Sequence, residues 1–176
     1  IRIALEPNPS FREVSSDRAD LGIAFGDGEE FSGPREMILQ PPIFPVCSPA
    51  FLAEHGPLEQ VSDLLRLRLP LLHEDDGYWW GAWLQCMGIK TRLSSEMSYV
   101  GADQVIDLAL AGAGVALTNP LLVIDELASG RLVRPLANEV PLEGYLLLSP
   151  PEGLKPEARV FREWLLEKLN APKVQG

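Results

Sequence analysis

Short apolar runs alternate with longer segments of helical periodicity along the whole chain, and this alternation constrains the fold more than any other feature. Runs of about five apolar residues between turn residues are typical of strands. Apolar residues spaced three and four positions apart are typical of helices that pack one face on a core. The alternation therefore predicts an α/β fold rather than a helical bundle or a β-sandwich. A chain of 176 residues is long enough for one domain or two small lobes.

Six apolar runs are predicted to be strands: residues 1–5, 21–25, 43–47, 115–117, 132–136 and 145–148. The first two are bounded by proline and glycine turns, and we expect them to be buried strands of one sheet. The third contains Pro45, which has no backbone N–H to donate. It is therefore expected at a sheet edge or at a crossing between lobes.

Helix boundaries are clearest around residues 48–56, where Ser48 can cap the first turn, Pro49 suits the first helical position and Gly56 can end the helix. Further helices are predicted over residues 80–87, 101–111 and 121–128, and from about residue 156 onward. Trp80 and Trp83 lie on the apolar stripe of their helix, so we expect them to pack in the core rather than stack on a ligand. The last helix presents one apolar stripe, made of Phe161, Trp164, Leu165 and Leu169.

Composition excludes several classes of function. Twenty-five acidic residues against 15 basic ones give a net charge of −10, so this part of the protein is not expected to bind nucleic acid. Cys47 and Cys86 are far apart and form no CxxC pair, which argues against a zinc site or a disulfide framework and favours free thiols. No apolar run approaches the roughly 18 residues that span a bilayer, and no signal peptide is evident. The sequence thus predicts a soluble, cytoplasmic protein.

Motifs for catalysis or cofactor binding are missing from the sequence. Neither a GxGxxG nor a P-loop pattern is present, so no nucleotide cofactor is expected, and residues 26–28 are predicted to form only a tight turn. No G-x-S-x-G nucleophile elbow occurs. His55 falls in the last turn of its predicted helix, where a histidine mostly bonds terminal carbonyls.

Two polar features leave alternatives open. The run His73-Glu74-Asp75-Asp76 is best interpreted as a solvated acidic loop, with a polar ligand contact second and a metal or catalytic role third, because adjacent residues rarely converge on one ion. Arg2, Arg12, Arg131 and Arg134 could clamp a carboxylate, although isolated arginines are usually surface residues.

A binding site is the remaining interpretation. Strands are predicted to end at Phe25-Gly26, at Cys47-Ser48 and at Thr118-Asn119. In an open α/β sheet, small ligands bind beyond the carboxyl ends of strands, beside helix N-termini. Free amides at Ser48 and Gly101 would favour an anion, and Asp103 could meet an ammonium group. A carboxylate or an amino acid is therefore the expected ligand.

The order of segments resembles a known family. Residues 19–28, ADLGIAFGDG, resemble the ADLAIRFGDG segment of LysR-type transcriptional regulators, and residues 45–52, PVCSPAFL, resemble their crossover segment. Further matching segments follow in family order, including residues 109–117, ALAGAGVAL, and 127–133, LASGRLV. The resemblance covers nearly the whole chain and is greatest to the branch that includes the glycine-cleavage and β-lactamase activators.

This resemblance implies a periplasmic-binding-protein-like (type II) fold of two lobes with a cleft between them. Lobe I would comprise residues 1–45 and 145–176, and lobe II residues 46–144. By position, the effector contacts of the family fall on Ser48, Tyr99, Gly101 and Thr118, with Phe25 and Gly26 at the cleft edge. The first strand and first helix of the family's sensing domain have no counterpart in this sequence.

The function implied is that of an effector-sensing domain, without enzymatic activity, metal or cofactor. It would bind a small metabolite, self-associate as a dimer or tetramer, and reach DNA only through an N-terminal winged helix-turn-helix domain that the sequence does not contain. Two alternatives remain. One is a periplasmic-type solute-binding protein, and the other is a small-molecule enzyme using His73, Glu74 and Asp103.

Overall fold

A computed structural model describes residues 2–7, 13–73, 77–91 and 102–170 of the chain. It divides into two compact units, the first made of Ile1–Gln40 and Glu143–Gly176 and the second of Pro41–Leu142. Both units combine strands with helices, which confirms the predicted α/β class. Within the described residues, none of the helices has the length and apolar character needed to cross a membrane.

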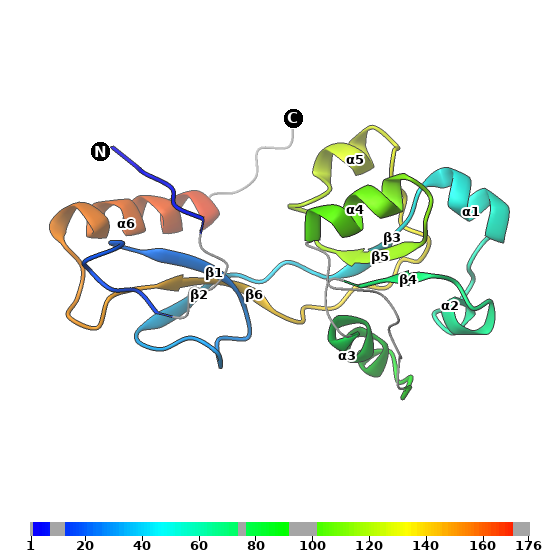
Figure 1. The fold of residues 1–176 in the computed structure, drawn as a ribbon, viewed down its shortest axis with the longest axis horizontal. Helices are drawn as coiled ribbons and strands as arrows, with labels where there is room; N and C mark the ends of the chain where they lie inside the picture. Colours follow the sequence, from blue (N-terminus) through cyan, green and yellow to red (C-terminus); the bar gives the residue numbers. More distant parts are fainter. Residues whose placement is uncertain (1, 8–12, 74–76, 92–101, 171–176) are drawn as a thin grey trace. The chain divides into compact units, whose positions relative to one another are not determined.

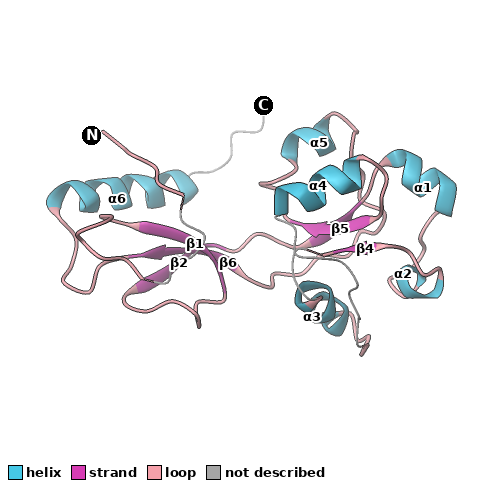
Figure 2. Ribbon diagram, viewed as in Figure 1, coloured by secondary structure: helices cyan, strands magenta, loops and turns pink. Residues whose placement is uncertain are grey.

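The first unit is a three-stranded antiparallel sheet with a long helix beside it (Figures 1 and 2). In the sheet, β6 lies between β1 and β2. The elements are β1 (Gly22–Gly26), β2 (Arg35–Leu39), β6 (Gly144–Leu148) and α6 (Pro156–Asn170). Val14, Phe31, Leu146 and Leu148 form its buried apolar cluster.

The second unit holds a smaller sheet in which β5 lies between β3 and β4. β3 is antiparallel to β5, and β4 is parallel to it. Helices α4 and α5 lie on one side of this sheet and α3 on the other (Figure 1). The elements are β3 (Phe44–Val46), α1 (Pro49–His55), α2 (Asp63–Arg66), β4 (Leu71–Leu72), α3 (Tyr78–Cys86), α4 (Ala102–Leu110), β5 (Val115–Thr118) and α5 (Ile124–Ala128).

Alternation along the strands directs one face of the second sheet into the core. The side chains of Phe44, Val46 and Ala116 pack with Val105 and Ala109 of α4. Residues two apart on a strand share a face, so Thr118 is on the same face as Ala116. This places Thr118 on the sheet face that α4 covers.

The prediction that residues 43–47 lie at a sheet edge or at a crossing between lobes is confirmed for the edge, because β3 is an outer strand of its sheet. β3 pairs with β5 on one side only, and isolated bridges join Ile43 to Val140 and Cys47 to Val133 on the other. Since backbone N–H groups alternate in direction along a strand, the missing N–H of Pro45 falls between these two bridges. Proline therefore removes no bond from the β3–β5 ladder.

Local signals located most helices correctly. Ser48 caps α1 by accepting the Phe51 N–H at 3.2 Å, and Gly56 follows the helix with φ 84°. Trp80 and Trp83 of α3 are 1% and 0% exposed, so both are core residues as predicted. α5 is shorter than predicted, because it begins at Ile124 rather than at residue 121.

Three strand predictions need correction. Residues 2–5 are exposed and belong to no strand, since apolar alternation does not by itself supply the neighbour that a strand needs for its backbone bonds. Within residues 132–136 only Val133 pairs, as an isolated bridge, because Pro135 has no N–H to extend a ladder. β1 is only half-buried, since it has a partner on one side alone.

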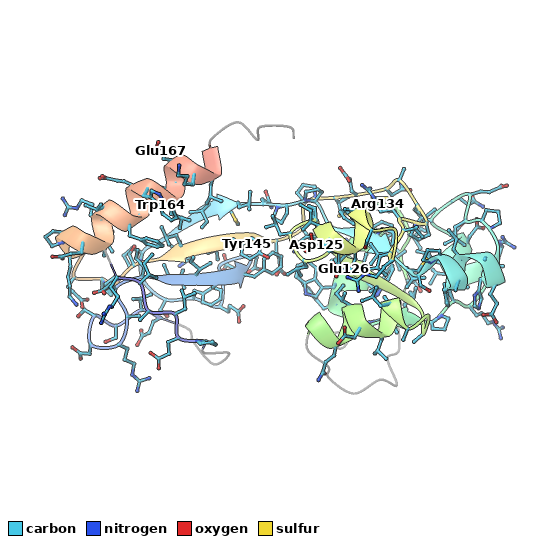
Figure 3. All side chains as sticks on the ribbon, turned by 90° about the horizontal axis from the view of Figure 1, so that it is seen from above. Asp125, Glu126, Arg134, Tyr145, Trp164 and Glu167 are labelled. Atoms are coloured by element: carbon cyan, nitrogen blue, oxygen red, sulfur yellow. The ribbon has the colours of Figure 1, made fainter. Side chains whose placement is uncertain are left out.

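The apolar stripe predicted for the last helix, α6, is only partly buried. Trp164 is 48% exposed (labelled in Figure 3), whereas Ala158 is buried. The helix packs near β2. Strand β2 was not predicted, because its sequence REMIL has no clear two-residue alternation.

Candidate ligand-binding site

Two buried polar residues stand at the carboxyl end of β5. Thr118 is 5% exposed and Asn119 is 3% exposed. No described residue forms a hydrogen bond with the Thr118 hydroxyl, Oγ1. A buried hydroxyl without a partner costs about 1–3 kcal/mol, so most such groups in proteins are satisfied. Among the described residues at this end of the sheet, Thr118 therefore has a buried hydroxyl that could bond an added group.

The fold explains why the hydroxyl lies at this place. Thr118 pairs with Phe44 of β3, at the end of the sheet where the chain enters the second unit at Pro41. α4 leads into β5 through a tight turn at Gly112 (φ 80°), so helix and strand run in opposite directions. The N-terminal end of α4 and the carboxyl end of β5 consequently share one end of the sheet.

Asn119 adds a polar group that the sequence reasoning did not include among the site residues. Its Oδ1 accepts the Leu121 N–H at 3.0 Å, and its backbone oxygen accepts the Leu122 N–H at 3.2 Å. These two bonds use only oxygen atoms of Asn119, so its Nδ2 group can still donate a hydrogen bond. The available signal was the Thr-Asn-Pro sequence directly after an apolar run, which is typical of an asparagine-capped turn.

Ser48 lies at the opposite end of the same strand pair. Val46 pairs with Ala116, so Ser48 is level with the residues that precede β5. A Cβ atom added at Gly112 would lie 3.4 Å from Ser48 Oγ. Four residues of strand separate this level from that of Thr118, about 13 Å at 3.3 Å per residue. The structure does not bring Ser48 and Thr118 together, because antiparallel strands have their carboxyl ends at opposite edges.

Phe25 and Gly26 belong to the first unit, at the end of β1. The Phe25 ring meets Tyr145 of β6 edge-on, with 4.9 Å between centroids (Tyr145 is labelled in Figure 3). Gly26 is buried, and Asp27 Oδ1 accepts the Glu29 N–H at 2.8 Å in the tight turn that follows. Their predicted contact with a ligand stays a prediction.

Tyr99 and Gly101 lie outside the described residues, as do Glu74, Asp75 and Asp76. His73 is buried at the end of β4, with 7% exposure. Among the residues that the structure describes, no three His, Cys, Asp or Glu side chains gather as a metal site would require. The metal interpretation of residues 73–76 thus gains no support from the described part.

His55 has a structural role, as its position in the helix predicts. Its Nδ1 lies 3.0 Å from the Phe51 carbonyl oxygen, and the two rings stack with 4.1 Å between centroids. Cys47 and Cys86 are free cysteines. Burial raises the pKa of the Cys47 thiol to about 11, which keeps it protonated and unreactive near neutral pH.

The arginines near the second sheet are engaged with the protein itself. Arg131 pairs with Glu126 at 2.8 Å on the surface. Arg134 pairs with Glu139 at 2.9 Å and stands over the Phe44 ring, 4.2 Å from its centroid (Arg134 and Glu126 are labelled in Figure 3). Because each arginine already pairs with a glutamate, binding of a ligand carboxylate by either arginine is less favourable.

Comparison with known proteins gives a consistent family. Residues 1–170 match the family described as the LysR substrate binding domain. The HTH-type transcriptional regulator PerR of Escherichia coli (strain K12) is 28% identical over 179 residues, which is 99% of this chain and 59% of PerR. The glycine cleavage system transcriptional activator of the same strain is 28% identical over 160 residues, 89% of this chain and 52% of its own length. This chain therefore spans between half and three-fifths of these relatives.

Solved structures share the fold. The effector domain of the regulator AmpR of Pseudomonas aeruginosa superposes with a TM-score of 0.72 at 28% identity, covering 88% of this chain and 73% of that one. Full-length AphB of Vibrio cholerae, at 19% identity, gives a TM-score of 0.71 and covers 96% of this chain and 58% of AphB. These neighbours establish the periplasmic-binding-protein-like α/β architecture that the resemblance implies.

Proposed function

This chain belongs to the LysR substrate-binding domain family, and from this premise we propose that it senses a small metabolite and reports its binding to transcription. The protein would not be an enzyme, and it would act in the cytoplasm, where its DNA target is. DNA contact would belong to a part of the protein other than these residues, since their net charge is −10. Self-association as a dimer or tetramer is part of this proposal.

The buried hydroxyl of Thr118 is the observation that carries the proposal. Because no described residue bonds it, a ligand that supplies the missing hydrogen bond would recover the cost of burying it. Asn119 Nδ2 and the N-terminal end of α4 offer donors at the same end of the sheet. Donors and a positive helix end suit a carboxylate, so we propose a small carboxylate or an amino acid as effector.

Binding would act by shifting a population. A ligand that prefers one of two conformations changes their ratio by no more than its difference in affinity for them. The regulatory output is then the change in that ratio. Effector identity and the choice between activation and repression depend on contacts that a fold alone does not specify.

Two other functions are weaker proposals. Relatives of this chain are named as regulators and activators of transcription, which favours sensing over turnover by His73. The same names favour a regulator over a periplasmic solute-binding protein, although both use this architecture.

The test is thermal stability of the chain across a panel of amino acids, small carboxylates and cell-wall fragments. A compound at 100 times its Kd adds about 2.7 kcal/mol to the free energy of unfolding. Thr118→Val keeps the side-chain shape and removes the hydroxyl. We expect it to leave the ligand-free melting temperature unchanged or raised, and to weaken binding of the active compound about tenfold.

Ser48→Ala is the matched control. Loss of the α1 cap should cost about 1 kcal/mol of stability, while the ligand-induced shift stays as in the unchanged chain if binding occurs at the Thr118 end. A shift that Ser48→Ala abolishes would instead support the original prediction for Ser48. The proposed role of Thr118 fails if Thr118→Val binds the active compound as tightly as the unchanged chain.

A further inference from the structure

We propose that Trp80 and Trp83 are positioning residues for the Thr118 site, because their indole N–H groups hold the ends of the two strands on either side of β5. The inference rests on the proposed function in that it treats the end of β5 as the binding site. It assigns a role to α3, which carries no residue predicted to touch the ligand.

Trp83 holds the start of β3. Its Nε1–H donates to the Ile43 carbonyl at 3.1 Å, in a buried bond. Ile43 directly precedes Phe44, the residue paired with Thr118. The same carbonyl accepts the Val140 N–H at 3.0 Å, so Trp83 is its second donor. Removing the indole N–H would weaken the attachment of Ile43 to α3, while the Ile43 carbonyl would keep its bond from Val140.

Trp80 holds the end of β4. Its Nε1–H donates to the Leu72 carbonyl at 2.9 Å, also in a buried bond. Leu72 is level with Ala116 of β5, and the Val115 N–H donates to Pro70 at 2.9 Å. Backbone donors alternate along a strand, so the Leu117 N–H also points toward β4. Trp80 thus acts beside Leu117, one residue from Thr118.

The two rings form a single rigid support. They lie three residues apart on α3 and meet edge to face, with 5.9 Å between centroids and 80° between planes. α3 lies on the side of the sheet away from α4 (Figure 1), whereas Thr118 is on the α4 side. The tryptophans can therefore fix the strand ends without occupying ligand space. A ligand-binding group is most effective when the residues around it keep it within about 0.5 Å of the geometry that binding requires.

The experiment replaces each indole by an isostere that cannot donate: Trp83→3-benzothienylalanine and Trp80→3-benzothienylalanine. Backbone hydrogen exchange is followed by NMR in the ligand-free chain. Loss of the Trp83 bond should speed exchange of Thr118 and Val140 about fivefold, and loss of the Trp80 bond should do the same for Leu117, because a net hydrogen bond is worth about 1 kcal/mol. Amides of β6, in the other unit, should keep their rates.

The same replacement at Trp164, which is 48% exposed on α6, is the matched control and should leave the exchange of Leu117 and Thr118 unchanged. If a benzothienyl variant does not fold, Trp83→Phe and Trp80→Phe remove the same donor. Unchanged exchange at these amides, or equal acceleration at every core amide of the second unit, would overturn the proposal. The experiment uses the ligand-free chain. A failure to find an effector would therefore count against the proposed function, and not against this role of the two tryptophans.

Discussion

Asp63 shows how one carboxylate can organise a loop. It is 3% exposed; its Oδ2 accepts the Glu59 and Gln60 N–H groups at 3.0 and 3.1 Å, and its Oδ1 accepts Arg66 Nε and Nη2 at 3.0 and 2.9 Å. The Arg66 side chain, helped by the two backbone bonds, holds the pKa of this carboxyl below its ordinary value. The ionised form is therefore the one that stabilises the fold.

We expect Asp63→Asn to lower the melting temperature by about 3 °C at neutral pH. A carboxyl whose pKa is lowered by folding stabilises above its unfolded pKa, and this contribution is lost as the pH falls through its folded pKa. The difference between Asp63→Asn and the unchanged chain should thus shrink as the pH is lowered from about 6 toward about 3. Thermal scans across that range measure it.

Arg66→Gln, which leaves the backbone bonds of Asp63 in place, should give a smaller loss at neutral pH. A melting-temperature difference for Asp63→Asn that stays constant with pH would show that charge is not involved. The partners of Asp63 lie within four residues along the chain, but its carboxylate accepts from N–H groups that precede it, and no standard helix-capping pattern predicts such bonds. The roles of Ser48 and His55 were predictable because a serine before a helix and a histidine in its last turn are standard capping patterns.

Gly114 determines how closely β4 and β5 approach. A Cβ atom built there would lie 2.4 Å from the Pro70 carbonyl oxygen and 3.1 Å from Leu72 Cγ, and real Cβ atoms do not come that close to backbone. Gly114→Ala must push the two strands apart at the start of their pairing. We expect a loss of about 2 kcal/mol or more in the free energy of unfolding, measured by urea denaturation.

Two other glycines allow the effect of steric crowding to be distinguished from the effect of backbone conformation. Gly88 has φ 78° and open space around it, so Gly88→Ala should cost about 1 kcal/mol from conformation alone. Gly81 lies inside α3 with nothing within 4 Å of an added Cβ, and Gly81→Ala should stabilise by about 0.5–1 kcal/mol. A Gly114→Ala loss no larger than that of Gly88→Ala would contradict the steric explanation.

The positions of helices were predictable where their sequence signals are local. The directions in which strands pair were not predictable. The cap at Ser48, the glycine after α1 and the apolar stripe of α3 depend on neighbours within one or two turns. The antiparallel pairing of β3 with β5 depends on residues 70 positions apart, and it decides that Ser48 and Thr118 lie at opposite ends. Residues 2–5 have strand-like alternation, but a pattern does not show whether a partner strand is present.

At the scale of the molecule, charge and fold both support the proposal that this part of the protein binds the effector and that another part contacts DNA. Each of the two units holds a small sheet, and within the described residues the buried Thr118 hydroxyl has no hydrogen-bond partner. In the whole sequence, 25 acidic residues outnumber 15 basic ones. Lysine and arginine side chains that neutralise DNA phosphates release condensed counterions into solution, and this release favours binding. A chain of net charge −10 gains little from this effect. Ligand sensing and DNA contact should therefore be separable.

We expect residues 1–176 alone to leave a 30-base-pair duplex unshifted in a gel at about 50 mM salt, even at about 100 µM protein, a concentration at which non-specific DNA-binding proteins are largely bound. Adding the compound that stabilises the chain should not change this result, because the ligand alters conformation and leaves the net charge strongly negative. Retardation that weakens steeply with salt would mean that basic residues gather on one face despite the overall balance. Such a finding would assign DNA contact to this part of the protein as well, and would remove the reason for placing it elsewhere.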